Sequence, residues 1–136
     1  MKRNRKIGSV TPALTNTTKT TVRFSEVDSM QVVWHGEYVR YFEDGREAFG
    51  RKYPGIGYLD FYAYGYTAPI VDLQLQYVAP LTVNDVAVIE TRLIDTAAAK
   101  LCFEYIIHRE CDGALVARGS SVQVFVDSDG NMCLNN

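Results

Sequence analysis

The stretch that decides the fold is Tyr38-Val-Arg-Tyr-Phe-Glu-Asp-Gly-Arg-Glu-Ala-Phe49. Its large aromatic residues and one glycine fall three or four positions apart, which is the spacing of one face of an α-helix. This stripe consists of Tyr38, Tyr41, Phe42, Gly45 and Phe49. Charged residues, including Arg46, occupy positions between them, which predicts that they face solvent. We predict an amphipathic helix that begins near His35 and Gly36 and ends before Pro54-Gly55.

Beyond the helix, apolar and polar residues alternate with a period of two, which is typical of half-buried β-strands. The clearest case is Val71 to Tyr77, which follows Pro69 and ends before Pro80. Strands are predicted over residues 20–24, 71–77, 86–94, 101–107 and 114–126. The four later strands are joined by connections too short for crossover helices, so we expect them to pair antiparallel. The predicted fold class is therefore α+β.

The length and charge of the chain exclude several classes of protein. The chain has 136 residues, of which 47% are hydrophobic, enough for one domain with its own core. The net charge of −2 gives no global attraction to nucleic acid, and no apolar run reaches the roughly 18 residues that span a membrane. Cys102, Cys111 and Cys133 form no CxxC pair, so we predict reduced thiols, no metal site and a cytoplasmic location.

The N-terminal residues differ in composition from the rest of the chain. Met1 to Lys6 carry four basic residues, threonine is frequent up to Thr21, and the first acidic residue is Glu26. This composition is typical of flexible segments and also of organelle transit peptides. We predict a flexible extension over residues 1–18, one domain over residues 19–130, and a C-terminal tail over residues 131–136.

A single helix cannot cover both faces of a five-stranded antiparallel sheet. The second face must then be either solvated or covered by another subunit. The apolar content of the last predicted strands favours a subunit. We therefore expect an obligate dimer.

The loop that enters the helix, Glu26 to Tyr38, holds the candidate chemistry. Neither His35 nor Gly36 is a strong N-cap, so free N–H groups at the helix start could bind an anion or a carbonyl oxygen. Asp28 lies seven residues before His35 and could fold over the helix start. A carboxylate, an imidazole and free amides in one place would suit acyl transfer. The alternative gives Asp28 a hydrogen bond within its loop and His35 a purely structural place at the helix end.

Two motifs carry a resemblance to a known family. Asp28-Ser-Met-Gln-Val-Val-Trp-His35-Gly-Glu-Tyr38, followed by Tyr41-Phe-Glu-Asp-Gly-Arg46, resembles the signature of the 4-hydroxybenzoyl-CoA thioesterase family. It is most similar to the bacterial acyl-CoA thioesterase branch, and the likeness extends over about residues 20–130. The resemblance implies the hotdog fold, in which a curved five-stranded antiparallel sheet wraps a long central helix. It also implies a homodimer or homotetramer with active sites at the subunit interface.

The same resemblance implies a reaction. The substrate would be an acyl-CoA thioester, hydrolysed to a free acid and CoA without a metal or cofactor. Asp28 would act as general base or nucleophile, and His35 would position substrate or water. Backbone amides at His35 and Gly36 would polarise the thioester carbonyl. The alternatives are a non-catalytic acyl-CoA-binding or regulatory module, and a hotdog dehydratase, which the spacing from Asp28 to His35 disfavours.

Three positions depart from the family pattern. Gln31 stands where glycine is usual, which predicts an altered tight turn and a side chain that reaches the pocket. Phe24 replaces a usual tyrosine, so a hydroxyl group is missing, and Trp34 replaces a usual tyrosine or phenylalanine. These departures bear on substrate choice and turnover more than on the class of reaction.

Several other residues have two interpretations. The aromatic stretch from Tyr53 to Tyr66 could line an acyl pocket, but packing across a dimer is favoured. Glu43 and Arg46 match the family helix and suggest an ion pair or an interface. His108 and Cys102 lie on strands and have no motif that supports a ligand or nucleophile role. The phosphates of CoA need basic partners, for which the sequence offers Arg92, Lys100, Arg109 and Arg118 without distinguishing among them.

Overall fold

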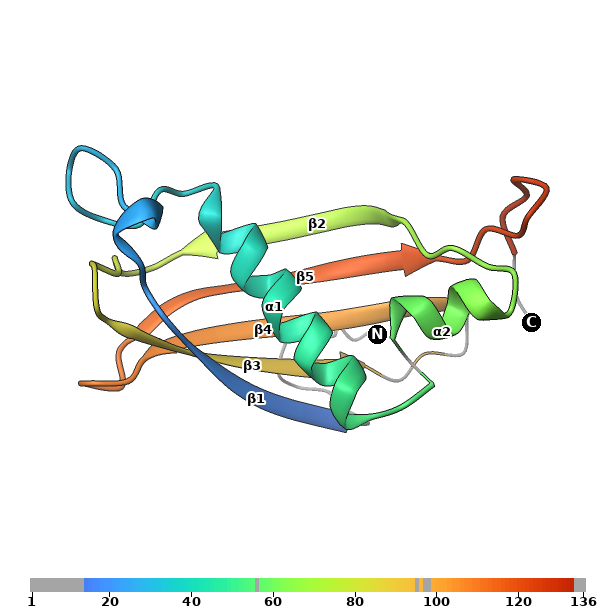
Figure 1. The fold of residues 1–136 in the computed structure, drawn as a ribbon, viewed down its shortest axis with the longest axis horizontal. Helices are drawn as coiled ribbons and strands as arrows, with labels where there is room; N and C mark the ends of the chain where they lie inside the picture. The colour runs from blue at the N-terminus through green and yellow to red at the C-terminus, as the bar shows by residue number, and fades with distance from the viewer. Residues whose placement is uncertain (1–13, 56, 95, 97–98, 134–136) are drawn as a thin grey trace, which may run out of the picture.

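The fold is one antiparallel sheet with a long helix across one of its faces (Figure 1). The computed structural model describes residues 14–55, 57–94, 96 and 99–133. Its elements are β1 (Leu14–Thr21), the 3-10 helix η1 (Phe24–Glu26), α1 (Glu37–Lys52), α2 (Tyr58–Ala63), β2 (Ile70–Tyr77), β3 (Val86–Ile94), β4 (Lys100–Arg109) and β5 (Leu115–Val124). The sheet order is β1-β3-β4-β5-β2, and every neighbouring pair is antiparallel. The predicted α+β class, with one central helix and five antiparallel strands, is confirmed.

The predicted helical stripe forms the centre of the core. Tyr38, Tyr41, Phe42, Gly45 and Phe49 are all buried between α1 and the sheet. The Phe42 ring stacks on Tyr105 of β4, with ring centroids 4.5 Å apart. A Cβ atom on Gly45 would lie 2.5 Å from the hydroxyl oxygen of Thr91 on β3. Glycine at this position therefore lets α1 approach the sheet closely enough to bury the stripe.

The prediction that Arg46 faces solvent is wrong. Its side chain is only 1% exposed, and its guanidinium lies 4.4 Å from the centroid of the Phe103 ring. Arg46 Nε donates a 3.5 Å hydrogen bond to Gln123 on β5, and Gln123 in turn donates one to the carbonyl of Ala68. The burial follows from geometry, because position 46 lies one helical turn after Phe42, beside the apolar stripe.

The first strand begins earlier than predicted. β1 runs from Leu14 to Thr21 and pairs with β3 along its whole length, so the boundary expected between residues 18 and 19 lies inside a strand. Composition misled the prediction, because the threonines that suggest a flexible segment are also β-branched residues that favour strands. Phe24, expected at the end of this strand, lies in η1 and is exposed. The rest of the predicted extension, residues 1–13, lies outside the described residues.

The other elements lie close to their predicted positions. β3 has the predicted bounds, β2 begins one residue earlier than predicted, and β4 and β5 each differ from prediction by one or two residues at both ends. The predicted tail partly folds back, since the Cys133 amide donates to the Phe125 carbonyl, while residues 134–136 lie outside the described residues. Among the described residues, no helix combines the length and apolar character that crossing a membrane requires.

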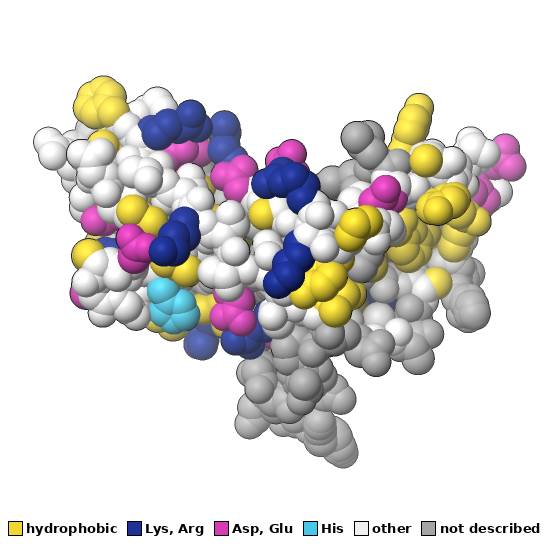
Figure 2. All heavy atoms as spheres, turned by 60° about the horizontal axis from the view of Figure 1, so that its bottom comes forward, with side chains coloured by type: hydrophobic (Ala, Val, Ile, Leu, Met, Phe, Trp, Pro, Cys, Tyr) yellow, Lys and Arg dark blue, Asp and Glu magenta, His cyan; other side chains and the backbone are white. Residues whose placement is uncertain are grey.

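The aromatic stretch from Tyr53 to Tyr66 contains the short helix α2. Phe61 of α2 packs on Phe125, with ring centroids 5.2 Å apart. Tyr62 and Tyr64 are 71% and 76% exposed. Figure 2 shows hydrophobic side chains gathered at the end of the molecule where α2 lies.

Candidate functional site

Asp28 is the first residue of a tight turn in a small hairpin before α1. Val27 and Val33 form an antiparallel bridge at the base of this hairpin. The Asp28 amide donates to the Val32 carbonyl at 2.9 Å, and the Gln31 amide donates to the Asp28 carbonyl at 2.9 Å. These bonds fix the backbone of the turn independently of any side chain.

The Asp28 carboxylate is held by its own turn. Its Oδ1 atom accepts a 2.8 Å hydrogen bond from the Met30 amide, a local bond that aspartate commonly forms in turns. Its Oδ2 atom accepts no hydrogen bond from any described residue. Among the described residues, one carboxylate oxygen thus has a hydrogen-bond partner and the other has none.

Gln31 occupies a left-handed position in this turn. It adopts φ of +67°, a conformation that glycine would adopt without strain. Its side chain is exposed and does not line the hollow beside His35. The departure from the family pattern therefore affects backbone energy at this turn.

Substitutions at Gln31 should change stability according to their tolerance of positive φ. We expect Gln31→Gly to raise the free energy of unfolding by about 0.5 kcal/mol, because relief of left-handed strain slightly exceeds the entropy cost of glycine. Gln31→Val should lower it by about 1 kcal/mol, because a β-branched residue resists this conformation. Urea unfolding of the two variants checks the prediction. Equal stabilities would contradict the conformation assigned to this turn.

A buried carboxylate anchors the hairpin to α1. Glu26 is 6% exposed, and its Oε1 atom accepts hydrogen bonds from the Tyr41 hydroxyl and the Arg23 amide, both at 2.9 Å. Burial, together with Glu26, raises the pKa of the Tyr41 phenol, so the hydroxyl stays a donor. The Glu26 carbonyl accepts a 3.0 Å bond from the Trp34 amide. Glu26 thereby joins both sides of the hairpin to the helix, a role that no spacing in the sequence indicates.

The start of α1 has no side-chain cap, as predicted. Gly36 occupies the N-cap position and provides no capping hydrogen bond. The backbone N–H groups of His35 and Gly36 donate no hydrogen bond to any described residue. Two free donors at a positively polarised helix end can bind a carbonyl oxygen or an anion.

His35 lies beside a shallow, open hollow of about 260 Å³. The hollow is lined by Val33, His35, Tyr38, Tyr77, Val78, Ala79 and Pro80. The His35 carbonyl accepts a 2.7 Å hydrogen bond from the Tyr77 hydroxyl of β2. The centroid of the His35 ring lies 4.9 Å from that of the Trp34 ring. The His35 side chain itself is exposed, so its ring nitrogens are open to a ligand.

The structure brings the predicted residues into one region but does not join them. The Asp28 hairpin and the helix start are tied by the bond between Trp34 and Glu26. Within the described part of the chain, however, the Asp28 carboxylate makes no hydrogen bond to His35 or Gly36, and Asp28 does not line the hollow beside His35. The described residues also contain no group of three or more His, Cys, Asp or Glu side chains that could hold a metal ion.

A comparison with known families identifies the chain. The model of the thioesterase-like superfamily matches residues 22–133, which include the hairpin, α1 and all strands except β1. The chain belongs to this family. The resemblance seen in the Asp28 and Tyr41 motifs is therefore confirmed at the level of the family.

Known members of the family have similar sequences and structures. YneP of Bacillus subtilis (strain 168), provisionally named an acyl-CoA thioesterase, is 32% identical over 108 residues, covering 79% of this chain and 77% of that protein. The crystal structure of hypothetical protein TT1821 from Thermus thermophilus is 31% identical, with a TM-score of 0.77 over 88% of this chain and 90% of that one. The DHNA-CoA thioesterase of Staphylococcus aureus is 25% identical, with a TM-score of 0.79 over 88% and 80% of the two chains. The hotdog fold is thus confirmed.

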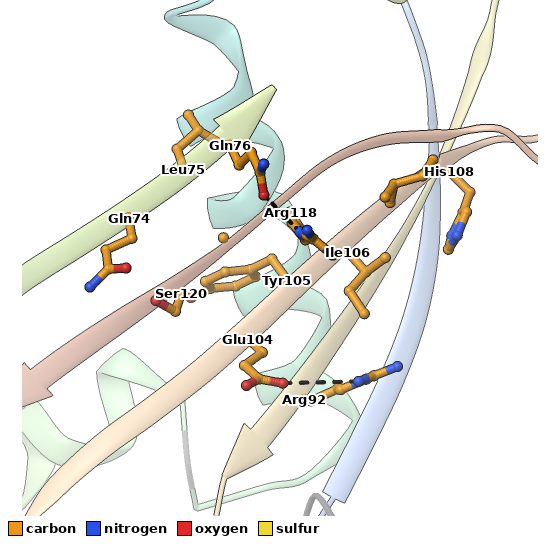
Figure 3. A pocket seen from close by; sticks show the side chains of 12 residues that line it. Gln74, Leu75, Gln76, Arg92, Glu104, Tyr105, Ile106, His108, Arg118 and Ser120 are labelled. Carbon is orange, nitrogen blue, oxygen red and sulfur yellow. Dashed lines mark hydrogen bonds and ion pairs between the residues drawn. The ribbon is translucent and has the colours of Figure 1, made fainter. Parts of the chain in front are cut away.

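A second hollow of this thioesterase-like chain, of about 400 Å³, lies on the face of the sheet away from α1 (Figure 3). Arg92 and Arg118 both point into this region, where Arg92 pairs with Glu90 and Glu104, and Arg118 Nε donates to Gln76 at 2.8 Å. His108 also lines this second hollow, so His108 lies away from the Asp28 hairpin. Arg109 is another of the basic residues considered for the CoA phosphates. It donates a hydrogen bond to the Pro80 carbonyl, and Pro80 lines the hollow beside His35.

The three cysteines are unpaired in the structure. Cys102 is half-buried on β4, and burial raises the pKa of its thiol. A raised pKa keeps the thiol protonated and weakly nucleophilic, which favours a structural role for Cys102.

Glu104 makes stability depend on pH. Burial raises the pKa of its carboxyl, although the Arg92 guanidinium 3.9 Å away opposes this shift. A raised pKa means that the charged form costs stability above the folded-state pKa, and that this cost disappears as pH falls through it. We expect Glu104→Gln to melt a few °C above wild type at about pH 7 and level with it at about pH 4. A melting-temperature difference that does not change with pH would contradict this assignment.

Proposed function

We propose that this chain hydrolyses an acyl-CoA thioester to a free acid and CoA. The observation that carries the proposal is the pair of free amides at His35 and Gly36, which lie beside a hairpin that presents Asp28 in a chain of the thioesterase-like superfamily. Acyl-CoA is the substrate class named for YneP, and CoA thioesters are named for the Staphylococcus aureus enzyme.

The residues suggest the following division of roles. The amides of His35 and Gly36 donate hydrogen bonds to the carbonyl oxygen and stabilise the negative charge that develops on it. The free Oδ2 atom of Asp28 either removes a proton from water or attacks the carbonyl carbon directly. In the first route, water oxygen bonds to the carbonyl carbon, the C–S bond breaks, and the proton returns to the thiolate of CoA. In the second, Oδ2 bonds to the carbonyl carbon, the C–S bond breaks and CoA leaves as a thiolate. Water then hydrolyses the resulting anhydride to the free acid, which restores the Asp28 carboxylate and supplies the proton for the thiolate. The exposed His35 ring positions substrate or water.

We infer that two copies of the chain pair through β2 to form a homodimer. β2 is an edge strand, and every one of its residues except Leu75 is exposed, including Val71 and Leu73. Natural proteins rarely leave such an apolar edge open. Because Tyr77 of β2 contacts His35, this pairing brings the partner next to the proposed site. A homotetramer would combine two such dimers.

Light scattering on the purified chain tests this pairing. We expect the mass of two chains at micromolar concentration. Val71→Lys, on the exposed edge, should shift the mass toward a monomer, whereas Val88→Lys on β3 lies away from that edge and serves as the control. A wild-type monomer at all concentrations would contradict the inference.

One observation favours a second candidate function. The bond from the Met30 amide gives Asp28 a structural role within its own turn. In a non-catalytic module that binds acyl-CoA at the amides of His35 and Gly36, Asp28 would need only this structural role.

Product analysis separates the two functions. The chain is incubated with acetyl-, hexanoyl-, palmitoyl- and benzoyl-CoA, and the mixture is examined by mass spectrometry. A thioesterase yields the free acid and CoA from at least one of them. A binding module retains the acyl-CoA, which is recovered intact.

A further inference from the structure

Trp34 is a single tryptophan that the fold leaves half exposed. It is the only tryptophan in the chain, and its side chain is 49% exposed. Its backbone is fixed at both ends, because its amide donates to the Glu26 carbonyl at 3.0 Å and its carbonyl accepts from the Glu37 amide at 2.9 Å. These bonds fix the direction in which the side chain leaves the backbone, and much of the apolar surface of the indole lies outside the core.

The indole lies against the residues that carry the free amides. A Cβ atom on Gly36 would lie 2.1 Å from Cζ3 and 2.4 Å from Cη2 of Trp34, so the six-membered ring covers the Cα atom of Gly36. The Trp34 and His35 rings are 4.9 Å apart and tilted by 47°. One side of the indole is thus occupied by Gly36 and His35, and the exposed part faces outward.

We propose that Trp34 is a specificity-determining residue that forms one wall of the acyl site and favours a flat acyl group. The proposal rests on the proposed function, because it requires the thioester carbonyl to bind at His35 and Gly36. A C=O bond is about 1.2 Å long, so a carbonyl bound there holds the first acyl atoms within a few ångströms of the indole. A flat ring at that position can stack on tryptophan, whereas a saturated ring of the same size cannot do so as well.

Glycine at position 36 is a condition of this arrangement. A Cβ atom at 2.1 Å from a ring carbon cannot be accommodated, so Gly36→Ala must displace the indole. With leucine at position 34, the ring that would clash is gone. Trp34 and Gly36 should therefore behave as one unit in a double-mutant cycle.

The experiment compares benzoyl-CoA with cyclohexanecarbonyl-CoA, and uses acetyl-CoA as a reference without a ring. We expect Trp34→Leu to lower kcat/KM for benzoyl-CoA by about tenfold and to change the value for acetyl-CoA by less than about twofold. Trp34→Phe keeps a flat ring and should retain most of the preference for benzoyl-CoA. Gly36→Ala should reduce this preference as much as Trp34→Leu does, and the double variant should lose no more.

Two outcomes overturn the proposal while hydrolysis stands. One is an unchanged ratio of benzoyl-CoA to cyclohexanecarbonyl-CoA in Trp34→Leu. The other is a uniform loss on all three substrates together with dissociation of the oligomer, which would make Trp34 a subunit contact.

Failure of the proposed function is recognised separately. If wild type releases no thiol from any acyl-CoA, tryptophan emission still reports on the inference, because Trp34 is the only tryptophan. We expect a saturable change in emission with benzoyl-CoA that is larger than with cyclohexanecarbonyl-CoA and absent in Trp34→Phe. This result would support Trp34 as a wall of the acyl site. Calorimetric binding without such a change, or no binding at all, overturns it.

Discussion

Replacing Asp28 with asparagine is expected to lower kcat for acyl-CoA hydrolysis by roughly 10²–10⁴-fold and to leave KM within a few-fold of wild type. Asparagine has nearly the same shape, and its side-chain oxygen can still accept the hydrogen bond from the Met30 amide. It can neither take a proton from water nor act as a nucleophile. The turn and the helix start therefore persist while the chemistry is lost. Initial rates on the preferred acyl-CoA measure both constants.

Asp129→Asn is the matched control for this substitution. Asp129 is exposed in the turn after β5, and only its backbone amide, which donates to Asp127, makes a hydrogen bond within the described residues. This variant should retain the rate of wild type. If Asp28→Asn also retained that rate, Asp28 would have only the structural role in its turn.

Replacing Arg46 with alanine should cause the largest loss of stability, about 3–5 kcal/mol in the free energy of unfolding. The side chain is buried, its guanidinium packs on the Phe103 ring, and its Nε donates to Gln123. Alanine leaves a void between α1 and the sheet and removes a hydrogen-bond donor from a buried amide oxygen. Chemical denaturation followed by circular dichroism measures the loss.

Arg51→Ala provides the comparison on the same helix. Arg51 is exposed and pairs with Glu47 one turn away at 3.4 Å, so its loss should cost only about 0.3–0.5 kcal/mol. Similar costs for the two arginines would show that Arg46 does not occupy the buried position described here.

The periodic parts of the fold could be predicted from the sequence. The stripe from Tyr38 to Phe49 and the alternation in β3 are long enough to define a helix face and a strand without further information. Both patterns arise because one side of each element is buried, and burial is what the spacing of apolar residues records.

Features that depend on tertiary contacts could not be predicted. Arg46 is polar in sequence and buried in space, because Phe103 and Gln123 lie on strands distant along the chain. β1 lacks a hydrophobic alternation, since it consists mostly of threonine and polar residues, and it is ordered by pairing with β3. Neither partner can be inferred from local spacing.

The candidate site, too, could be predicted only in part from the sequence. The uncapped start of α1 could be predicted, because it follows from the residue types at His35 and Gly36. The anchoring of the hairpin by Glu26 could not, because its partner Tyr41 is fifteen residues away and meets it only through the packing of α1. The left-handed conformation of Gln31 also emerged only from the structure.

The role of Asp28 in thioester hydrolysis is tested most directly by release of free CoA thiol from the acyl-CoA panel, with wild type and Asp28→Asn assayed side by side at equal concentration. We expect steady release from at least one acyl-CoA by wild type and a nearly flat trace from the variant, with both proteins folded to the same extent. Equal release by the two proteins, or none by wild type, would contradict it.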